Sequence, residues 1–430
     1  FNYKSYYFNK LLLEEISYIK SNSIKNVKND LELIKFISAR NTKDTKDTKD
    51  TKDTKILFNI EKHKVGGAEK QFHILYNIAN NYFQSIGGTI NLTYSEEKTF
   101  DFEKYKKSNL SAQHKATIRL IKNTTLKKYV FNAAINQLFY NPFYIISSMH
   151  YCGLGNLVAN KIIGKNSYNY IRIGSQPPTK LTMPDHKINK YSLIQNMYEL
   201  YKDEMSIIVN CSYLRKLYQS ILPYNRIIKI YNVANKPDTP NNVNIQTTTV
   251  KIGFVGRNTP SKNIISLVSL FSKLEKEVST PIALYIYSDK LRATPVEELV
   301  NKLNLHSKIH LLEHEEDPTK IYPTFDLYVS LSTEEGLSNS IMEALSYNIP
   351  CISLDAGGSN EIITHNINGY ICKNGYELYN CLITMLENNK EFIRIKKNMA
   401  MDKFNLEKFS AIQVQKKIEE EVVYQKTILP

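Results

Sequence analysis

The residues best suited to chemistry are two glutamates that frame a short polar turn. Glu335 and Glu343 stand eight residues apart in EGLSNSIME, between an apolar run and a helical pattern. The turn between them comprises Gly336, Leu337, Ser338 and Asn339. Ser338 or Asn339 can cap the helix, and the backbone N–H groups of the turn can bind a phosphate. Glu343 is placed to accept hydrogen bonds from a ribose diol, and Glu335 from a sugar ring.

Two cations follow another apolar run. In GRNTPSKN, Gly256 ends the run, and Arg257 and Lys262 occupy the loop before the next helical pattern. Such a pair can bracket a diphosphate and stabilise its charge as it leaves. Two solvated basic residues are a common alternative in such a loop, but the position after the first strand of a Rossmann-like series favours the functional interpretation.

The first half of the chain has weaker candidates at the same kind of position. Gly66 and Gly67 follow the run KILFNI and open a helix, His150 ends PFYIISSMH, and Arg172 lies near the end of YNYIRI. Two glycines allow a ligand to approach the helix N-terminus, although they do not form the GxGxxG dinucleotide fingerprint. His150 can bond to a sugar hydroxyl or a developing charge. Arg172 is a weaker candidate for contact with an acceptor.

These residues require strands that end at a common edge. Short apolar runs alternate with helical patterns in two consecutive series, which is typical of parallel sheets covered by helices. The expected strands lie at 55–60, 142–149, 168–173 and 205–210 in the first series, and at 251–256, 281–287, 308–313, 325–330 and 349–354 in the second. We therefore expect an α/β protein with two tandem Rossmann-like, doubly wound domains and a cleft between them.

Composition sets the expected domain boundaries. Residues 43–54 are four KDT triplets without an apolar side chain, and KPDTPNNVNIQTTT interrupts the alternation of strands and helices. The expected segments are a helical extension at 1–42 that can dimerise, a repeat linker at 43–54, a first domain at 55–235, a linker at 236–249, a second domain at 250–404 and a final helix at 405–430.

The net charge of +14 is concentrated in one region. Residues 56–249 contain 24 basic and 11 acidic side chains, whereas residues 250–404 contain 16 and 19. A basic region attracts anionic partners, and the basic stretch 104–128 either lies on an anionic membrane surface or packs normally on the sheet. Scattered cysteines argue against a disulfide framework and a zinc site, so a cytoplasmic location is expected, at the inner face of the membrane if that stretch binds lipid.

Together these motifs resemble the retaining glycosyltransferases of family 4, the group 1 glycosyltransferases, which have a GT-B fold. The resemblance is specific over 251–390 and moderate over 55–235. It implies that Arg257 and Lys262 bind the donor diphosphate, that Glu335 contacts the donor sugar, and that Glu343 contacts the ribose. Gly66 and Gly67 correspond to the family's glycine-rich loop near the donor phosphate and the acceptor, His150 to the family's cleft histidine, and Asn232 to the asparagine of its segment before the linker.

The implied reaction is transfer of a sugar from a nucleotide diphosphate sugar, by preference a UDP-sugar, with retention at the anomeric carbon and without a metal or other cofactor. His150, Arg257, Lys262 and Glu335 would be the catalytic residues. The first domain would bind the acceptor, for which its charge suggests an anionic or lipid-linked glycan. The implied setting is assembly of bacterial surface polysaccharide, lipopolysaccharide or glycoprotein, and the final helix would cross back to the first domain.

Two segments depart from the family's motifs, and two other functions are compatible with part of the sequence. The family's EKN is SKN here, and its glycine-containing turn after the second strand is replaced by Tyr287-Ser288-Asp289-Lys290. A sugar-nucleotide 2-epimerase would share the fold. A nucleic-acid-binding protein would explain the pI of about 9.2, but it leaves the paired glutamates and cations without a role, so no nucleic-acid partner is expected.

Overall fold

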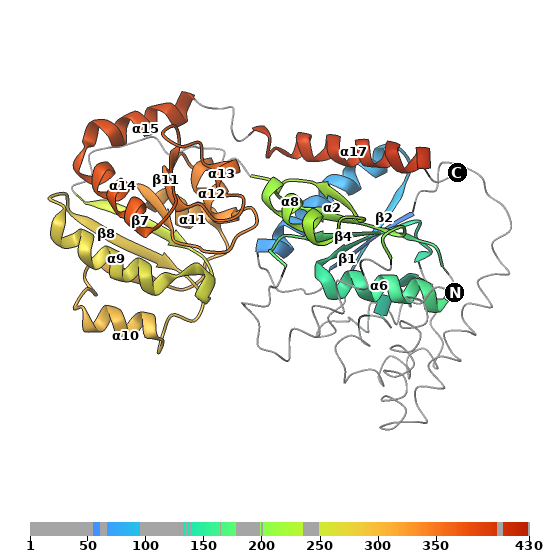
Figure 1. The fold of residues 1–430 in the computed structure, drawn as a ribbon, viewed down its shortest axis with the longest axis horizontal. Coiled ribbons are helices and arrows are strands. Elements are labelled where there is room, and N and C mark those ends of the chain that lie inside the picture. Colours follow the sequence, from blue (N-terminus) through green and yellow to red (C-terminus); the bar gives the residue numbers. More distant parts are fainter. Residues whose placement is uncertain are drawn as a thin grey trace, which may run out of the picture. The chain divides into compact units, whose positions relative to one another are not determined.

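A computed structural model describes most of both predicted series (Figure 1). The described residues are 55–60, 67–94, 129, 132–133, 136–137, 140–163, 165–177, 198, 201–234, 249–401 and 407–428. The chain divides into two compact units. One contains residues up to 173 together with 178–208 and 218–228, and the other contains residues 174–177, 209–217 and 229–430.

Within the described residues, the first sheet has six strands in the order β2-β1-β3-β4-β5-β6. Their bounds are β1 Lys55–Ile60, β2 Thr89–Tyr94, β3 Tyr144–Ser148, β4 Tyr168–Ile173, β5 Met205–Val209 and β6 Arg226–Lys229. β1 pairs in parallel with both β2 and β3, and β3 pairs in parallel with β4. The order of the strands reverses between β1 and β3, which makes the carboxyl ends of these two strands the switch point of the sheet.

The helices with described bounds that accompany this sheet are α2 at Gly67–Ser85, α6 at Met149–Ile163 and α8 at Ser212–Ile221. α2 packs on β1 and β2, and α6 packs on β1, β3 and β4. β1 is almost wholly buried, and Phe58 meets Phe72 of α2 edge-on at a centroid distance of 5.5 Å. Burial of one such side chain stabilises the fold by about 2 kcal/mol.

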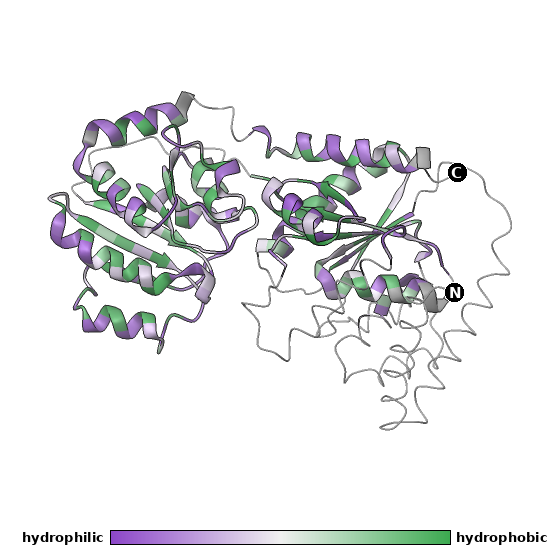
Figure 2. Cartoon of the chain, viewed as in Figure 1, coloured by the Kyte–Doolittle hydropathy of each residue, from purple (hydrophilic) through white to green (hydrophobic). Residues whose placement is uncertain are grey.

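The second sheet also has six strands among the described residues, in the order β12-β11-β10-β7-β8-β9, and its neighbouring strands pair in parallel. The bounds are β7 Val250–Val255, β8 Ile282–Tyr287, β9 Ile309–Leu312, β10 Leu327–Ser330, β11 Cys351–Leu354 and β12 Gly369–Cys372. Hydrophobic residues run along the strands of both sheets (Figure 2). Here the switch point lies between β7 and β10.

Helices and short 3₁₀ turns connect the strands of the second sheet or follow its last strand. They are η2 Pro260–Lys262, α9 Ile264–Glu277, α10 Pro295–Lys302, α11 Pro318–Ile321, η3 Tyr322–Thr324, α12 Asn339–Ser346, α13 Ser359–Ile362, α14 Gly375–Glu387, α15 Asn389–Met401 and α17 Ala411–Ile428. α12 packs on β10 and β11, and α14 packs on β11 and β12. The predicted alternation of strands and helices is therefore confirmed in both series, with element ends shifted by a few residues.

Several predicted features differ from the structure or lie outside its described residues. β2, β6 and β12 are strands that the sequence pattern did not indicate. The extension 1–42, the repeat 43–54, the basic stretch 104–128 and nearly all of the linker 236–249 lie outside the described residues. None of the helices in the described part of the chain is both long enough and apolar enough to span a membrane.

Candidate active site at the β7–β10 switch point

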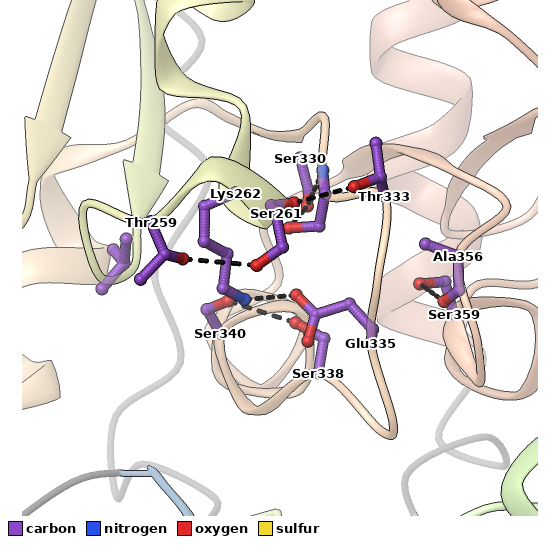
Figure 3. Close-up of polar contacts among 12 residues, drawn as sticks. Thr259, Ser261, Lys262, Ser330, Thr333, Glu335, Ser338, Ser340, Ala356 and Ser359 are labelled. Atoms are coloured by element: carbon purple, nitrogen blue, oxygen red, sulfur yellow. Dashed lines mark hydrogen bonds and ion pairs between the residues drawn. The ribbon is translucent and has the colours of Figure 1, made fainter. Parts of the chain in front are cut away.

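The predicted cation Lys262 and the predicted carboxylate Glu335 form an ion pair in the structure. The Nζ atom of Lys262 donates to Oε1 of Glu335, and Figure 3 shows the lysine reaching across to the glutamate from the neighbouring loop. Their side chains are only 17% and 12% exposed. β7 and β10 are adjacent parallel strands, so the loops that follow them leave the sheet at the same edge. The topology therefore brings together residues that are 73 positions apart.

Backbone hydrogen bonds hold the two loops against each other. The N–H of Thr333 donates to the carbonyl of Ser261 at 2.9 Å, and the N–H of Lys262 donates to Thr259 at 2.9 Å. Pro260 starts the 3₁₀ turn that ends at Lys262, and Asn263 follows with φ of 57°. Asparagine tolerates this left-handed conformation better than most residues. The SKN segment thus turns sharply, and its lysine is anchored at the strand ends.

Two glycines after β11 support the backbone of Glu335. Gly357 has φ of +61°, and a Cβ atom on it would lie 1.9 Å from the carbonyl oxygen of Glu335. Gly358 donates its N–H to the carbonyl of Gly336 at 2.8 Å. Only glycine permits this approach. The sequence shows this pair of glycines shortly after the predicted strand 349–354, but it does not show that they lie against Glu335.

The turn after Glu335 leads into α12, as expected. Ser338 occupies the N-cap position, although its hydroxyl makes no capping bond and lies 3.2 Å from the hydroxyl of Ser340. Asn339 begins the helix, and its side-chain oxygen accepts a hydrogen bond from Asn232 at 2.8 Å. The N–H of Leu337 donates to the side chain of Asn210 at 3.2 Å. Asn232 and Asn210 thus hold the turn by hydrogen bonds, and Asn232 is the residue that the resemblance matched to the family's asparagine before the linker.

Glu343 lies in α12 with its side chain half-buried. Its Oε2 atom accepts a hydrogen bond of 2.8 Å from the hydroxyl of Tyr322. Tyr322 is fully buried, and burial together with the nearby carboxylate raises its pKa well above the ordinary tyrosine value. No motif in the sequence indicated this tyrosine, because it precedes Glu343 by 21 residues and belongs to a different element.

Arg257 projects from the loop after β7 and is exposed. Its loop is fixed by Asp289, whose carboxylate accepts the N–H of Asn258 at 2.9 Å. Lys290, next to Asp289, has φ of 52°. The turn after β8 therefore uses the left-handed conformation that glycine favours, although it contains no glycine. Gly256 precedes Arg257 and bonds through its N–H to the carbonyl of Tyr287 at 3.1 Å.

The candidates of the first unit differ in their exposure to solvent. Gly67 is the first residue of α2, while Gly66 lies outside the described residues. His150 lies in the first turn of α6, where its Nδ1 atom is 2.6 Å from the hydroxyl of Tyr198, and its Nε2 atom is buried without a hydrogen-bond partner. Burial lowers the pKa of His150 to about 4. Arg172, 7% exposed in β4 opposite Ser148 of β3, has its pKa lowered by burial to about 10.

The chemistry available at the β7–β10 switch point follows from these contacts. The ammonium and the carboxylate of this ion pair can each release the other and bind part of a ligand instead. The ammonium then binds an anion, and the carboxylate binds hydrogen-bond donors. An anionic phosphate suits Lys262 and Arg257, and hydroxyl donors suit Glu335 and Glu343. Among the described residues, no group of three or more histidine, cysteine, aspartate or glutamate side chains is arranged to hold a metal ion.

Residues 235–403 match the family model described as glycosyl transferases group 1. An uncharacterized glycosyltransferase of Methanocaldococcus jannaschii is 32% identical over 143 residues, which are 33% of this chain and 35% of that protein. The poly(ribitol-phosphate) alpha-N-acetylglucosaminyltransferase of Staphylococcus aureus is 25% identical over 157 residues, 36% of this chain and 30% of that protein. The chain thus spans about a third of the length of these relatives.

Structural comparison extends over more of the chain. The structure of Anabaena HepE, solved in complex with UDP and glucose, aligns with 86% of this chain and 100% of its own length, with a TM-score of 0.62 and 15% identity. At that identity the likeness concerns the fold. Residues 235–403 are therefore similar in sequence to a group 1 glycosyltransferase domain, and the two parallel sheets have the GT-B fold that the resemblance implied.

Proposed function

We propose that this protein is a retaining, metal-independent glycosyltransferase that moves a sugar from a nucleotide diphosphate sugar to a glycan acceptor. The observation that carries the proposal is the ion pair of Lys262 and Glu335 at the β7–β10 switch point. The pair lies within the residues that match the group 1 family model. The pair also stands at the strand edge where doubly wound sheets bind their ligands.

In the proposed reaction, the donor diphosphate replaces Glu335 as the partner of Lys262, and Arg257 binds the same diphosphate. Glu335, released from the ammonium, accepts hydrogen bonds from the donor sugar. The backbone N–H groups at the start of α12 add a fixed positive potential near the phosphate. Glu343 binds the ribose. The bond between the sugar and the phosphate breaks as the charge on the leaving diphosphate is stabilised by these groups.

Proton transfer in this proposal requires little from a protein base. The acceptor hydroxyl attacks the anomeric carbon from the side that the diphosphate leaves, and the departing phosphate oxygen takes the proton. The enzyme then acts mainly by orientation and charge stabilisation. His150, whose pKa of about 4 keeps the imidazole neutral near pH 7, would act as a neutral hydrogen-bonding group and not as a general acid.

A UDP-sugar is the donor we propose, because the similarly folded HepE was solved with UDP. For the acceptor we propose an anionic or lipid-linked glycan of bacterial surface polysaccharide, lipopolysaccharide or glycoprotein assembly, at the inner face of the cytoplasmic membrane. Residues 56–249 contain 24 basic and 11 acidic side chains. One of the relatives is named for a poly(ribitol-phosphate) acceptor, which is an anionic polymer.

The experiment begins with thermal unfolding of the full chain in a panel of UDP-, GDP-, ADP- and CMP-sugars. A ligand that binds the native state raises the unfolding temperature. The stabilising donor is then used in transfer assays with anionic glycan acceptors and EDTA, and the anomeric configuration of the product is read by NMR. Product with inverted configuration, or loss of activity in EDTA, would contradict the finer assignment. Epimerised donor without any transfer would identify a sugar-nucleotide epimerase instead.

A further inference from the structure

We propose that Tyr322 is a positioning residue that sets the orientation of the Glu343 carboxylate for the ribose of the donor. This inference rests on the proposed function and adds a residue that no motif in the sequence contains. Its starting point is the hydrogen bond of 2.8 Å from the Tyr322 hydroxyl to Oε2 of Glu343. Tyr322 itself is fully buried, whereas Glu343 is only half-buried.

The ring of Tyr322 is held on several sides by other aromatic rings. It stacks on Tyr347 with a centroid distance of 5.7 Å and an interplanar angle of 20°. Phe325 meets it edge-on at 6.0 Å, and Tyr328 lies at 6.4 Å. Rings packed in this way resist rotation, because a turn of the side chain would break its contacts with these neighbouring rings. The hydroxyl is therefore fixed before a ligand arrives.

The backbone of Tyr322 is fixed as well. Its N–H donates to the carbonyl of Pro318, and its own carbonyl accepts the N–H of Phe325 at 3.0 Å. These bonds join α11 and η3 into one tight connection before β10. The tyrosine thus projects from a short, doubly anchored turn that leaves its hydroxyl little freedom.

The contact with α12 spans one helical turn. Tyr347 lies four residues after Glu343, and its N–H donates to the Glu343 carbonyl at 3.2 Å. The ring of Tyr322 therefore packs against one end of this turn while its hydroxyl binds the carboxylate at the other. Two contacts at different points define the orientation of the glutamate more closely than a hydrogen bond alone would.

The hydrogen bond does not prevent Glu343 from binding a ligand. An ionised carboxylate can accept about four hydrogen bonds, so a bond from one phenol leaves capacity for a pair of hydroxyl donors. The terminal torsion of a glutamate side chain is soft, and the bond from the phenol restricts it. The bond from Tyr322 would thus reduce the ordering that a vicinal diol must impose when it binds.

The test compares UDP with 2′,3′-dideoxy-UDP, which lacks the ribose diol, by calorimetric titration of the full chain. The measured quantity is the ratio of the two dissociation constants. This ratio is independent of the fraction of folded protein, so it remains valid if Tyr322→Phe is less stable. Glu343→Gln and the double variant Tyr322→Phe/Glu343→Gln complete a double-mutant cycle. Tyr370→Phe is the matched control, since Tyr370 is also buried and donates to the carboxylate of Glu391.

We expect Tyr322→Phe to reduce the preference for UDP over its dideoxy analogue roughly three- to tenfold, as expected for the loss of one hydrogen bond of ordinary strength. In the Glu343→Gln background the same change should have almost no effect, and Tyr370→Phe should retain the wild-type ratio. If Tyr322 only fills space, the ratio in Tyr322→Phe will equal that of the wild type, and the inference is wrong. Additive effects in the cycle would also overturn it, because Tyr322 would then act independently of Glu343.

Failure of the proposed function gives a different result in this experiment. If the wild-type protein binds none of UDP, GDP and ADP, the nucleotide-sugar assignment is wrong, and the role of Tyr322 falls with it. If the wild type binds UDP with a clear preference over the dideoxy analogue and Tyr322→Phe keeps that preference, only the inference about Tyr322 is contradicted.

Discussion

The two sheets have equivalent switch points but place different kinds of side chain there. At the β7–β10 switch point, Lys262 and Glu335 are charged, partly accessible and paired with each other. In the first unit, Arg172 is buried, His150 is half-buried with a shielded Nε2 atom, and burial lowers the pKa of both. A partly accessible charge that is already paired can exchange its partner for a ligand at a moderate cost in free energy. A buried group has already lost its hydration on folding. The second unit is therefore suited to bind a charged ligand. The first unit is suited to offer a ligand a small number of polar groups in fixed positions.

The largest effect should follow removal of the cation at the β7–β10 switch point. Lys262→Ala removes a charge that we place on the leaving diphosphate, and transfer should fall by roughly a hundred- to a thousandfold. Steady-state assays with the identified donor measure this. Lys308→Ala is a matched control, because Lys308 also pairs with a glutamate, Glu275, but on the surface, with 45% of its side chain exposed. Near-normal turnover in Lys262→Ala would contradict the proposed site.

A second change disturbs the same site through the backbone alone. Gly357→Ala places a methyl group where the carbonyl oxygen of Glu335 lies, 1.9 Å from the ideal Cβ position, at a φ of +61°. The Glu335 loop must move, and a displacement of about 1 Å in a catalytic group can cost on the order of a hundredfold in rate. We expect kcat to fall by roughly this factor, together with a loss of about 1–2 kcal/mol of stability from the left-handed backbone.

Gly375→Ala provides the control for this substitution. Gly375 begins α14, and a Cβ atom on it would meet nothing within 4 Å. Its stability should change by less than about 0.5 kcal/mol, and its activity should match that of the wild type. Equal activity of the two alanine variants would show that the support under Glu335 is not needed for the reaction.

Lys262→Ala and Gly357→Ala concern two kinds of contact, of which the sequence could predict only the first. Lys262 and Glu335 were recognisable because each stands in the loop that follows a predicted strand, and parallel topology then brings strand ends together. The approach of Gly357 to Glu335 and the bond from Tyr322 to Glu343 depend on side-chain and backbone distances between separate elements. Such distances leave no periodic pattern in the chain. β12 escaped prediction for a related reason: GYIC is short and its strand begins at a glycine.

The third prediction concerns the first unit and the pH dependence of stability. The pKa of His150 falls from 6.5 to about 4 on folding because the imidazole is buried. Between these values the unfolded chain binds more protons than the folded one, so stability falls as the pH falls from 6.5 to 4. The loss from this residue is at most about 3 kcal/mol. Denaturant unfolding of wild type and His150→Phe at pH 8, 6 and 4.5 should show a shallower decline in the variant; parallel declines would contradict the shielding of His150.

The smallest effect on the reaction should follow substitution of Arg172. It should change only the binding of the acceptor. Arg172→Lys keeps a positive charge but removes the planar fork that binds an anionic group at two points. We expect the KM for an anionic acceptor to rise roughly tenfold, which corresponds to one such hydrogen bond to a charged group, while donor hydrolysis without acceptor remains unchanged. Arg215→Lys, at an exposed arginine, makes the same chemical change as a control. A rise in the donor KM would place Arg172 on the donor side and remove the contrast between the two switch points.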